Sequence, residues 1–410
     1  MPSKKGMIVS MKVIIHRGTN QIGGCITEIS SNSGTKIIID IGSNLPNSEG
    51  IKKPEMELDG LTKGEPKYDA VLITHYHGDH IGLYNKILPK IPIYTGEVTK
   101  ELFKILQNHL AIADLVTSKE LETIEKFKTF KIPDKLEIGD IIITPIAVDH
   151  SAFDAYMFLI EADGKKILHT GDFRTHGQRG KAVLKAIKQY VGKVDCLICE
   201  GTTLTRNNNK LLTEFQLQKE AENIFKNHKY NFVLCSSTNI DRIAALHKAS
   251  LNTHKMFICD KYQGDILEYV NKHSRSKLYK FNDGINTKVY YYGPNMLEKM
   301  TKYGFVMLVR ANDKFKPILD KFNSNAFIYS QWLGYLKDEN ENYKKLQDFV
   351  PKDYIYLHTS GHASPEAIKE VIETTNPNVV IPIHTEEKTK LTELTDKAKI
   401  LEDNEEYIII

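Results

Sequence analysis

The sequence predicts an α/β protein built from two domains that differ in texture. In the first part, short runs of apolar and β-branched residues are separated by Gly and Asn turns, a pattern typical of strands. A polar stretch at Thr202–Lys210 then resembles a linker. Beyond it, apolar runs of strand length alternate with amphipathic helices, which predicts a parallel sheet covered on both faces. The length of 410 residues accommodates two or three domains.

The first part contains eight expected strands and few helices. A helical stretch is expected from Ile81, a helix over Glu97–Ala113 and a second helix over Ser118–Phe127. The expected strands are Lys12–His16, Cys25–Ser30, Lys36–Asp40, Tyr68–Thr74, Ile141–Val148, Ala155–Glu161, Lys166–His169 and Cys196–Cys199.

The second part and the tail repeat a strand-and-helix unit. The expected helices include Glu214–Asn227, Asn239–Ser250 and Pro365–Thr374. The expected strands are Asn231–Cys235, Met256–Cys259, Lys288–Tyr292, Phe305–Val309, Ala326–Ser330, Tyr354–Leu357 and Val379–Ile383.

Composition excludes several classes of protein. Hydrophobic residues make up 41% and charged residues 26%, as in ordinary globular proteins, and the net charge of +3 neither requires nor excludes a nucleic-acid partner. No apolar stretch approaches the roughly 20 residues of a membrane-spanning helix. The five cysteines form no disulfide framework, and we expect Cys196 and Cys199 to be buried strand thiols. These features predict a cytoplasmic protein.

The strongest motif is a run of metal-ligand residues directly after the apolar strand that ends at Thr74. His75, His77, Asp79 and His80 place three imidazoles and a carboxylate within six residues. Neutral imidazole and carboxylate suit zinc and similar divalent ions. His75 and His77 can face one ion from an extended segment, while Asp79 and His80 can reach a second ion beside it.

Further candidate ligands follow later strands. His150 comes after Ile141–Val148, Asp172 after the next strand pair and His384 after Val379–Ile383. A carboxylate that bridges two ions about 3.5–4 Å apart is the arrangement that activates water in many hydrolases. Together these residues predict a centre for two ions.

The order of these motifs resembles that of the metallo-β-lactamase superfamily. The resemblance implies two Zn²⁺ per chain, with Mn²⁺ or Mg²⁺ as alternatives, and Asp172 as the bridge between the two ions. It also matches Asp40 to a supporting residue that is not a ligand. The implied ligands are His75, His77 and His150 for one ion and Asp79, His80 and His384 for the other.

Within the superfamily the chain is similar to the β-CASP nucleases, and most of all to the ribonuclease J group. The similarity rests on the acid in Cys199-Glu200-Gly-Thr202, on His358-Thr-Ser-Gly-His362 and on His384. It implies a metallo-β-lactamase αββα sandwich with an inserted β-CASP parallel α/β domain. The implied domains are 1–203 for the first part of the sandwich, 204–355 for the β-CASP domain and 356–410 for the completing part.

The chemistry of phosphodiester hydrolysis assigns roles to residues beside the metal site. The reaction needs an activated water, neutralised phosphoryl oxygens and a proton for the leaving oxygen. We expect His362 to supply that proton, Glu200 to hold its imidazole and Asp79 to orient the water. The resemblance also implies a phosphate pocket formed by Thr238, at the expected N-terminus of a helix, together with Ser360 and His358.

The sequence departs from the group's pattern in three places. Asp241 stands where the resemblance leads us to expect a His, which would weaken an anion pocket. The chain ends at Ile410, so we expect no counterpart of the C-terminal domain of full-length ribonuclease J. Trp332 is the only tryptophan, and we expect it to be buried rather than to stack on a base.

The resulting hypothesis is a metal-dependent ribonuclease that acts on single-stranded RNA. His384 favours RNA, because many DNA-directed relatives lack a His at that motif. The alternatives are a DNA nuclease of the same fold, a small-molecule metallohydrolase such as a lactonase, and an inactive RNA-binding scaffold. A flavodiiron-type oxidoreductase would need a flavin domain for which the length leaves little room. Exonuclease or endonuclease action and the choice between monomer and homodimer stay open.

Overall fold

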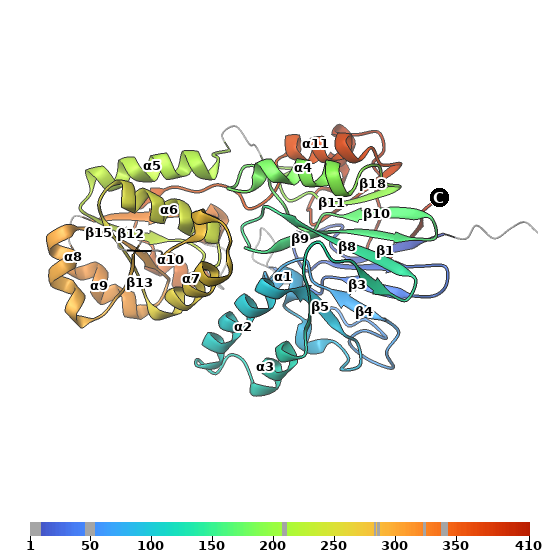
Figure 1. Ribbon diagram of the computed structural model, residues 1–410, viewed down its shortest axis with the longest axis horizontal. Helices are drawn as coiled ribbons and strands as arrows, with labels where there is room; N and C mark the ends of the chain where they lie inside the picture. The colour runs from blue at the N-terminus through green and yellow to red at the C-terminus, as the bar shows by residue number, and fades with distance from the viewer. Residues whose placement is uncertain are drawn as a thin grey trace, which may run out of the picture.

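The chain forms two lobes in the computed structural model, which describes residues 10–45, 54–206, 211–282, 284, 288–322, 325–337 and 343–410 (Figure 1). One lobe contains two packed sheets, and the other contains a third sheet with its helices. None of the helices in this described part is long and apolar enough to cross a bilayer.

The first sheet of the larger lobe has seven strands in the order β19-β1-β2-β3-β4-β5-β6. Its strands β3 to β6 run parallel, and the others pair antiparallel. The strands are β1 (Lys12–Arg17), β2 (Ile26–Ser30), β3 (Lys36–Ile39), β4 (Ala70–Leu72), β5 (Ile93–Gly96), β6 (Lys128–Phe130) and β19 (Glu406–Ile408).

The second sheet has six strands in the order β18-β11-β10-β9-β8-β7. Because β18 pairs in parallel with β11, the tail of the chain completes a sheet begun by the first part. The strands are β7 (Leu136–Ile138), β8 (Ile141–Val148), β9 (Ala155–Ala162), β10 (Lys165–His169), β11 (Cys196–Glu200) and β18 (Val379–Ile383).

Helices cover the outer faces of this sheet pair, which gives the αββα layering expected for the fold. Buried Ile39, Phe158 and Ile381 fill the space between the sheets. The second sheet packs on α4 (Gly180–Tyr190) and α11 (Pro365–Thr375). The first sheet packs on α1 (Gly78–Ile81), α2 (Glu97–Ala111) and α3 (Ser118–Glu125).

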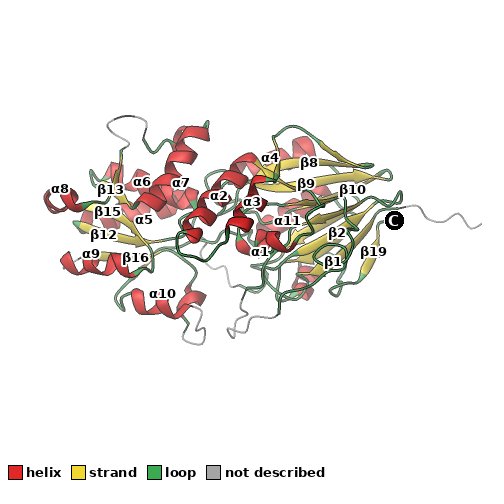
Figure 2. Cartoon of the chain, turned by 90° about the horizontal axis from the view of Figure 1, so that it is seen from below, coloured by secondary structure: helices red, strands yellow, loops and turns green. Residues whose placement is uncertain are grey.

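The third sheet is parallel throughout, with the order β14-β13-β15-β12-β16-β17. Its helices lie on both faces, as Figure 2 shows for α6 and α7 on one side and α9 and α10 on the other. The strands are β12 (Tyr230–Leu234), β13 (Met256–Cys259), β14 (Val289–Tyr291), β15 (Phe305–Val309), β16 (Ala326–Tyr329) and β17 (Ile355–Tyr356), and the helices are α5 (Glu214–Asn227), α6 (Ile240–Asn252), α7 (Lys261–His273), α8 (Leu297–Tyr303), α9 (Lys316–Lys321) and α10 (Lys344–Phe349).

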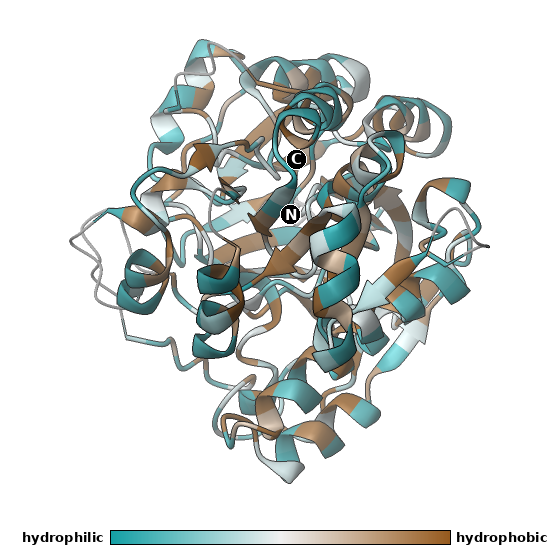
Figure 3. Ribbon diagram, turned by 90° about the vertical axis from the view of Figure 1, so that its left-hand side faces the viewer, coloured by the Kyte–Doolittle hydropathy of each residue, from teal (hydrophilic) through white to brown (hydrophobic). Residues whose placement is uncertain are grey.

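Hydrophobic burial accounts for both lobes. Figure 3 shows apolar strands at the centre, surrounded by helices with hydrophilic outer faces. One core cluster is continuous across the lobes, from Val71 and Phe103 to Val233 and Val270. The lobes are therefore joined by packed side chains as well as by the chain itself.

Two sequence-based expectations need correction. The stretch from Thr202 is not a solvated linker at its start, because Thr202 and Thr203 are buried and hydrogen-bonded, while residues 207–210 lie outside the described part. A helical stretch was expected to begin at Ile81, but the helix α1 begins at Gly78 and ends at Ile81. Cys196 and Cys199 are buried thiols on β11, as predicted.

Candidate metal centre

The candidate ligands gather at one end of the two packed sheets. His75 and His77 follow β4, His150 follows β8, Asp172 follows β10 and His384 follows β18. Each side chain is thus carried by a loop that begins where a buried strand ends. The packed sheets fix the loop starts, which brings together residues that are more than 300 positions apart in the chain.

Asp79 and His80 enter the site from the short helix α1. His77 is the N-cap of this helix, and Asp79 lies in its first turn. His80 Nδ1 donates to Asp40 Oδ2 at 2.7 Å, which turns Nε2 of the same ring toward the site. This contact is the one that the supporting role implied by the resemblance would need, since carboxylates commonly orient metal-binding imidazoles in this way.

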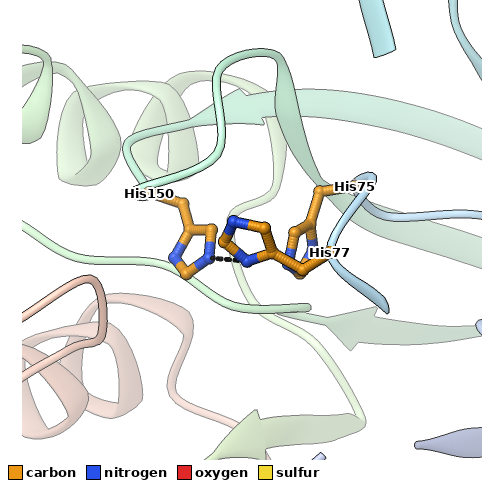
Figure 4. A group of neighbouring side chains, drawn as sticks. All are labelled: His75, His77 and His150. Atoms are coloured by element: carbon orange, nitrogen blue, oxygen red, sulfur yellow. Dashed lines mark hydrogen bonds between the residues drawn. The ribbon is translucent and has the colours of Figure 1, made fainter. Parts of the chain in front are cut away.

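Three imidazoles form the first ligand group. The ligand atoms of His75, His77 and His150 all lie within 4.8 Å of one another. Figure 4 shows the three rings turned toward a common centre, with Nε2 of His150 3.2 Å from Nδ1 of His77. His150 is fixed from behind, because its Nδ1 donates to the Gly361 carbonyl at 2.7 Å.

The second ligand group consists of Asp79, His80 and His384, whose ligand atoms also lie within 4.8 Å of one another. Asp172 lies between the two groups. Its Oδ2 is 3.2 Å from His80 Nε2 and 3.7 Å from His384 Nε2, and on the other side it is 4.0 Å from His75 Nε2. This is the position that a bridging carboxylate would need.

Buried atoms without partners test whether a metal fits. His75 Nε2, His80 Nε2 and both Asp172 oxygens are buried without a hydrogen-bond partner among the described residues. Buried polar atoms in proteins are otherwise almost always paired. Burial lowers the pKa of His75 and of His150, and lowers that of His77 to about 4. Neutral imidazoles and orphaned carboxylate oxygens are the donor set that divalent ions take.

The backbone at this site is held in an uncommon conformation. Asp40 has φ of 61° and His384 has φ of 53°, in the left-handed region that side chains rarely adopt. The His384 N–H donates to the Gly18 carbonyl at 2.7 Å, and its Nδ1 lies 2.7 Å from Thr202 Oγ1. Such strain persists where surrounding contacts outweigh it, which is common at functional sites.

Glu200 and His362 form a pair beside the metal centre. His362 Nδ1 donates to Glu200 Oε2 at 3.1 Å, while Glu200 Oε1 accepts the backbone N–H of Phe173 at 2.8 Å. Glu200 is buried, so it is not a solvated strand end. Burial by itself lowers the pKa of His362, but Glu200 and Asp172 outweigh it and raise that pKa. The geometry also places Asp172, Glu200, His362 and His384 within 4.8 Å of one another, as a possible ligand group.

The residues expected to hold phosphate are only partly brought together. The N-cap of α6 is Asn239 and not Thr238. The Thr238 hydroxyl lies 3.1 Å from Ser236 Oγ, and Thr238 lines a cavity of roughly 380 Å³. Among the described residues, neither His358 nor Ser360 lines that cavity. Ser360 Oγ instead accepts the His362 N–H at 3.1 Å.

A buried charge network between the lobes was missed by sequence reasoning. Arg174 pairs with Asp149, Glu214 and Asp241, and Arg242 pairs with Glu214. Asp241 also accepts from the Tyr279 hydroxyl, so its charge is matched and buried rather than facing an anion pocket. The signal available was Arg174, two residues after Asp172, but nothing in the sequence identifies its distant partners.

The expectation of a buried Trp332 is wrong. Its exposed fraction is 41%, and Arg206 lies over its ring at 5.2 Å from the centroid.

Two family models match the chain. Residues 39–267 match the beta-lactamase superfamily domain, and residues 354–406 match the Zn-dependent metallo-hydrolase RNA specificity domain. The first match contains all the candidate ligands except His384, which lies in the second.

Known proteins resemble the chain over most of its length. It is 23% identical to ribonuclease J of Helicobacter pylori over 92% of this chain and 56% of that protein, so it spans about half the length of this relative. It is 27% identical to cleavage and polyadenylation specificity factor 73 of Drosophila melanogaster over 51% of this chain and 31% of that protein. A crystal structure of a protein of unknown function from Enterococcus faecalis shares the fold, with a TM-score of 0.75, 20% identity and coverage of 97% of this chain and 100% of that one. The chain thus belongs to the metallo-β-lactamase superfamily, as a member of its β-CASP group related to ribonuclease J.

Proposed function

We propose that the protein is a zinc-dependent ribonuclease that hydrolyses phosphodiester bonds of single-stranded RNA. The observation that carries the proposal is the Glu200–His362 pair, which lies 3.5 Å from Asp172 at the edge of the ligand cluster. A small-molecule hydrolase of this superfamily would need neither the third sheet nor this pair. The RNA specificity domain match covers His358, Ser360, His362 and His384.

Seven residues would hold two divalent ions, which supply an activated water and positive charge for the phosphoryl oxygens when bound. The ligand sets are His75, His77 and His150 for one ion and Asp79, His80 and His384 for the other, with Asp172 between them. Zinc is the favoured metal because imidazole nitrogen predominates among the donors.

The chain's own residues move the protons. Asp79 orients the attacking water through its carboxylate. Burial raises the pKa of this carboxyl, but His80 and His384 outweigh burial and lower it. As the phosphorus–oxygen bond breaks, His362 donates the proton that the leaving oxygen needs. Its Nδ1 is occupied by Glu200, so Nε2 is the atom that faces the substrate. A positioned general acid of this kind is worth about 10²–10⁴-fold in rate.

The experiment that tests the function uses purified, zinc-loaded protein. End-labelled single-stranded RNA and DNA of one sequence carry a 5′-monophosphate, triphosphate or hydroxyl. We expect cleavage of RNA, and product ladders distinguish trimming from the 5′ end from internal cuts. Cleavage of DNA alone would identify a DNA nuclease of the same fold, and no cleavage of either would contradict the proposal.

The proposed location is the cytoplasm. All five cysteines are buried and unpaired, which fits a reducing compartment. Fractionation of cells with an antibody against the protein would test it.

A further inference from the structure

Arg206 lies near His362, the candidate general acid, because it follows closely after Thr202, whose hydroxyl is 3.2 Å from His362 Nδ1. Of the described residues, none forms a hydrogen bond or ion pair with its guanidinium, which lies over the Trp332 ring at 5.2 Å from the centroid. Burial lowers the pKa of Arg206 by more than the charges of Glu200 and Glu386 raise it. Buried arginines are normally paired, so Arg206 is a candidate to bind a ligand.

Aromatic side chains lie next to Arg206, beginning with Trp332. We call Trp332, Tyr335, Tyr343 and Tyr356 the aromatic wall. Tyr335 packs edge-to-face on Trp332 at 5.4 Å and contacts Tyr343 at 4.7 Å between ring centroids. Tyr335 and Tyr356 are near enough to influence the pKa of Arg206.

The aromatic wall borders the metal centre. The charge of Asp79 reaches both Tyr335 and Tyr343 and, after burial, is among the causes that raise their pKa values. Tyr356, on β17, contacts His358 at 6.0 Å between ring centroids. The wall therefore extends from β17 of the third sheet toward the site of the proposed chemistry.

Part of the aromatic wall is exposed to solvent and does not belong to a hydrophobic core. Trp332 is 41% exposed and Tyr356 is 43% exposed, whereas large aromatic residues in this lobe such as Phe232 and Phe305 are fully buried. A Cβ atom at Gly334 would lie 2.2 Å from the indole, so the glycine allows the indole to lie against the backbone of Leu333–Leu336. Exposed rings that are held in place at a polar site contribute little to core packing, but their faces are available for stacking.

We propose that Arg206 and the aromatic wall form a binding subsite for single-stranded RNA next to the metal centre. The guanidinium binds a backbone phosphate adjacent to the scissile bond, and the exposed faces of Trp332 and Tyr356 stack on flanking bases. Base stacking tolerates any sequence because every base has an aromatic face. Arginine suits this place because it binds phosphate in a bidentate manner and packs on aromatic rings. The inference rests on the proposed ribonuclease function and adds to it how the substrate is held.

The single tryptophan makes the subsite directly observable. Since Trp332 is the only tryptophan in the chain, its emission reports on this position alone. The zinc-loaded protein is mixed rapidly with octauridylate, and the emission of Trp332 is recorded before turnover. We expect octauridylate to quench the tryptophan emission. An RNA duplex, whose bases are already stacked, should not quench it, and neither should an oligomer of the same length without bases.

Substitutions separate the two halves of the subsite. Trp332→Ala should weaken binding of labelled octauridylate about 5- to 150-fold in fluorescence anisotropy, while Trp332→Phe should stay near wild type. Arg206→Gln should reduce the slope of log affinity against log salt by about 0.7, the share of one phosphate contact on a single strand. Trp332→Ala should leave that slope unchanged.

Tyr303→Ala is the matched control, because Tyr303 is an exposed tyrosine with Lys302 over its ring, on α8 at the far end of the smaller lobe. It should change neither affinity nor slope. Equal losses in this control would mean that the effect is not specific to the wall, and an unchanged slope in Arg206→Gln would overturn the phosphate assignment.

Cleavage by the wild type distinguishes this inference from the proposed function. If the wild type cleaves RNA but saturating octauridylate leaves tryptophan emission unchanged, the subsite is wrong and the function stands. If the wild type neither binds nor cleaves RNA, both fail. Quenching by single-stranded DNA but not by RNA would overturn the assignment of the ligand.

Discussion

At the residue scale, the Glu200–His362 pair is the feature most open to test. We expect His362→Ala to slow RNA cleavage by about 10²–10⁴-fold, the usual worth of a positioned general acid. Metal content, measured by elemental analysis, should not change, because His362 is outside the two proposed ligand sets. The matched control is His109→Ala, a partly exposed histidine on α2 that pairs with Asp265 away from the site.

The structure also allows a different role for His362, that of a metal ligand. Asp172, Glu200, His362 and His384 lie close enough to share an ion. If His362→Ala loses one metal ion, His362 is a ligand and the general acid is another group. A near-normal rate with full metal content would contradict the acid role alone.

The pH profile gives a second prediction at this scale. Protonated His362 is the active form of a general acid, so activity is present below its pKa and is lost as pH rises through it. Burial lowers this pKa, whereas Glu200 and Asp172 raise it by more. Glu200→Gln removes one of the raising charges, and the alkaline limb of kcat should therefore move to lower pH. A limb that stays in place would mean that it reports a group other than His362.

The candidate ligands have a stronger signal in the sequence than the residues around them. His75, His77, Asp79 and His80 are adjacent in the chain, so one motif reveals them. Thr202, which lies 2.7 Å from His384 Nδ1 at a sequence separation of 182, gives no comparable signal. Side chains that support a site are defined by tertiary contact, which a local pattern does not contain.

At the scale of elements, the buried charge network fixes α5 and α6 against the larger lobe. Glu214, at the start of α5, accepts from Arg174 of the larger lobe and from Arg242 of α6, and all three are fully buried. Removing one charge leaves the others uncompensated in a dry environment. We expect Glu214→Gln to lower the free energy of unfolding by about 3–5 kcal/mol in urea titration.

Glu220→Gln, an exposed change on the same helix, is the control and should have little effect. The two arginines hold the pKa of Glu214 at about 2 although burial opposes them. Because this folded-state pKa is lowered, the pair stabilises the protein above the ordinary pKa of a glutamate, and the contribution is lost as pH falls toward 2. A Glu214→Gln variant as stable as wild type at neutral pH would contradict the role of this network.

Elements with strong local signals were predicted well and others were missed. Both ends of α5 match the prediction, since a capping box at Thr213 and an amphipathic repeat define it. The helix α4 was missed although Val183 and Ile187 recur at helical spacing. The strands β5, β6 and β7 were also missed, because they have three or four residues each, too few for a clear alternation.

At the scale of the whole molecule, metal binding is the property that joins distant segments. The candidate ligand sets draw on residues from 75 to 384, and four of their atoms are buried without hydrogen-bond partners in the described part of the chain. We expect zinc-reconstituted protein to contain two ions per chain and to melt at a higher temperature than chelator-treated protein, because binding to the folded state alone stabilises it. A reproducible content of one ion or fewer would contradict the dinuclear centre.

The division into two lobes follows from the change of texture in the sequence. The return of the chain to the larger lobe does not follow from the sequence pattern, because the pairing of β18 with β11 is a contact between residues far apart in the chain. The boundaries at 203 and 355 stay predictions, and the second falls within β17. Parallel pairing across such distances has no local signature, and the resemblance to a known family supplied it.

The last prediction concerns the 5′ end of the substrate, which would lie where the two lobes meet. Asp241 no longer argues against a phosphate there, because Arg174 pairs with it at 3.1 Å. Ser360 supports His362 through its hydroxyl, and Thr238 lines a separate cavity, so the two contribute less directly than a shared pocket would. We therefore expect a modest preference for 5′-monophosphate over 5′-hydroxyl RNA in competition assays with end-labelled substrates. The double change Ser360→Ala with Thr238→Ala should reduce this preference by less than the roughly 1.5–3 kcal/mol that each direct charge-assisted hydrogen bond is worth, because the two hydroxyls do not line one pocket. Internal cleavage should stay measurable in that variant, and equal wild-type rates on both ends would identify the enzyme as an endonuclease.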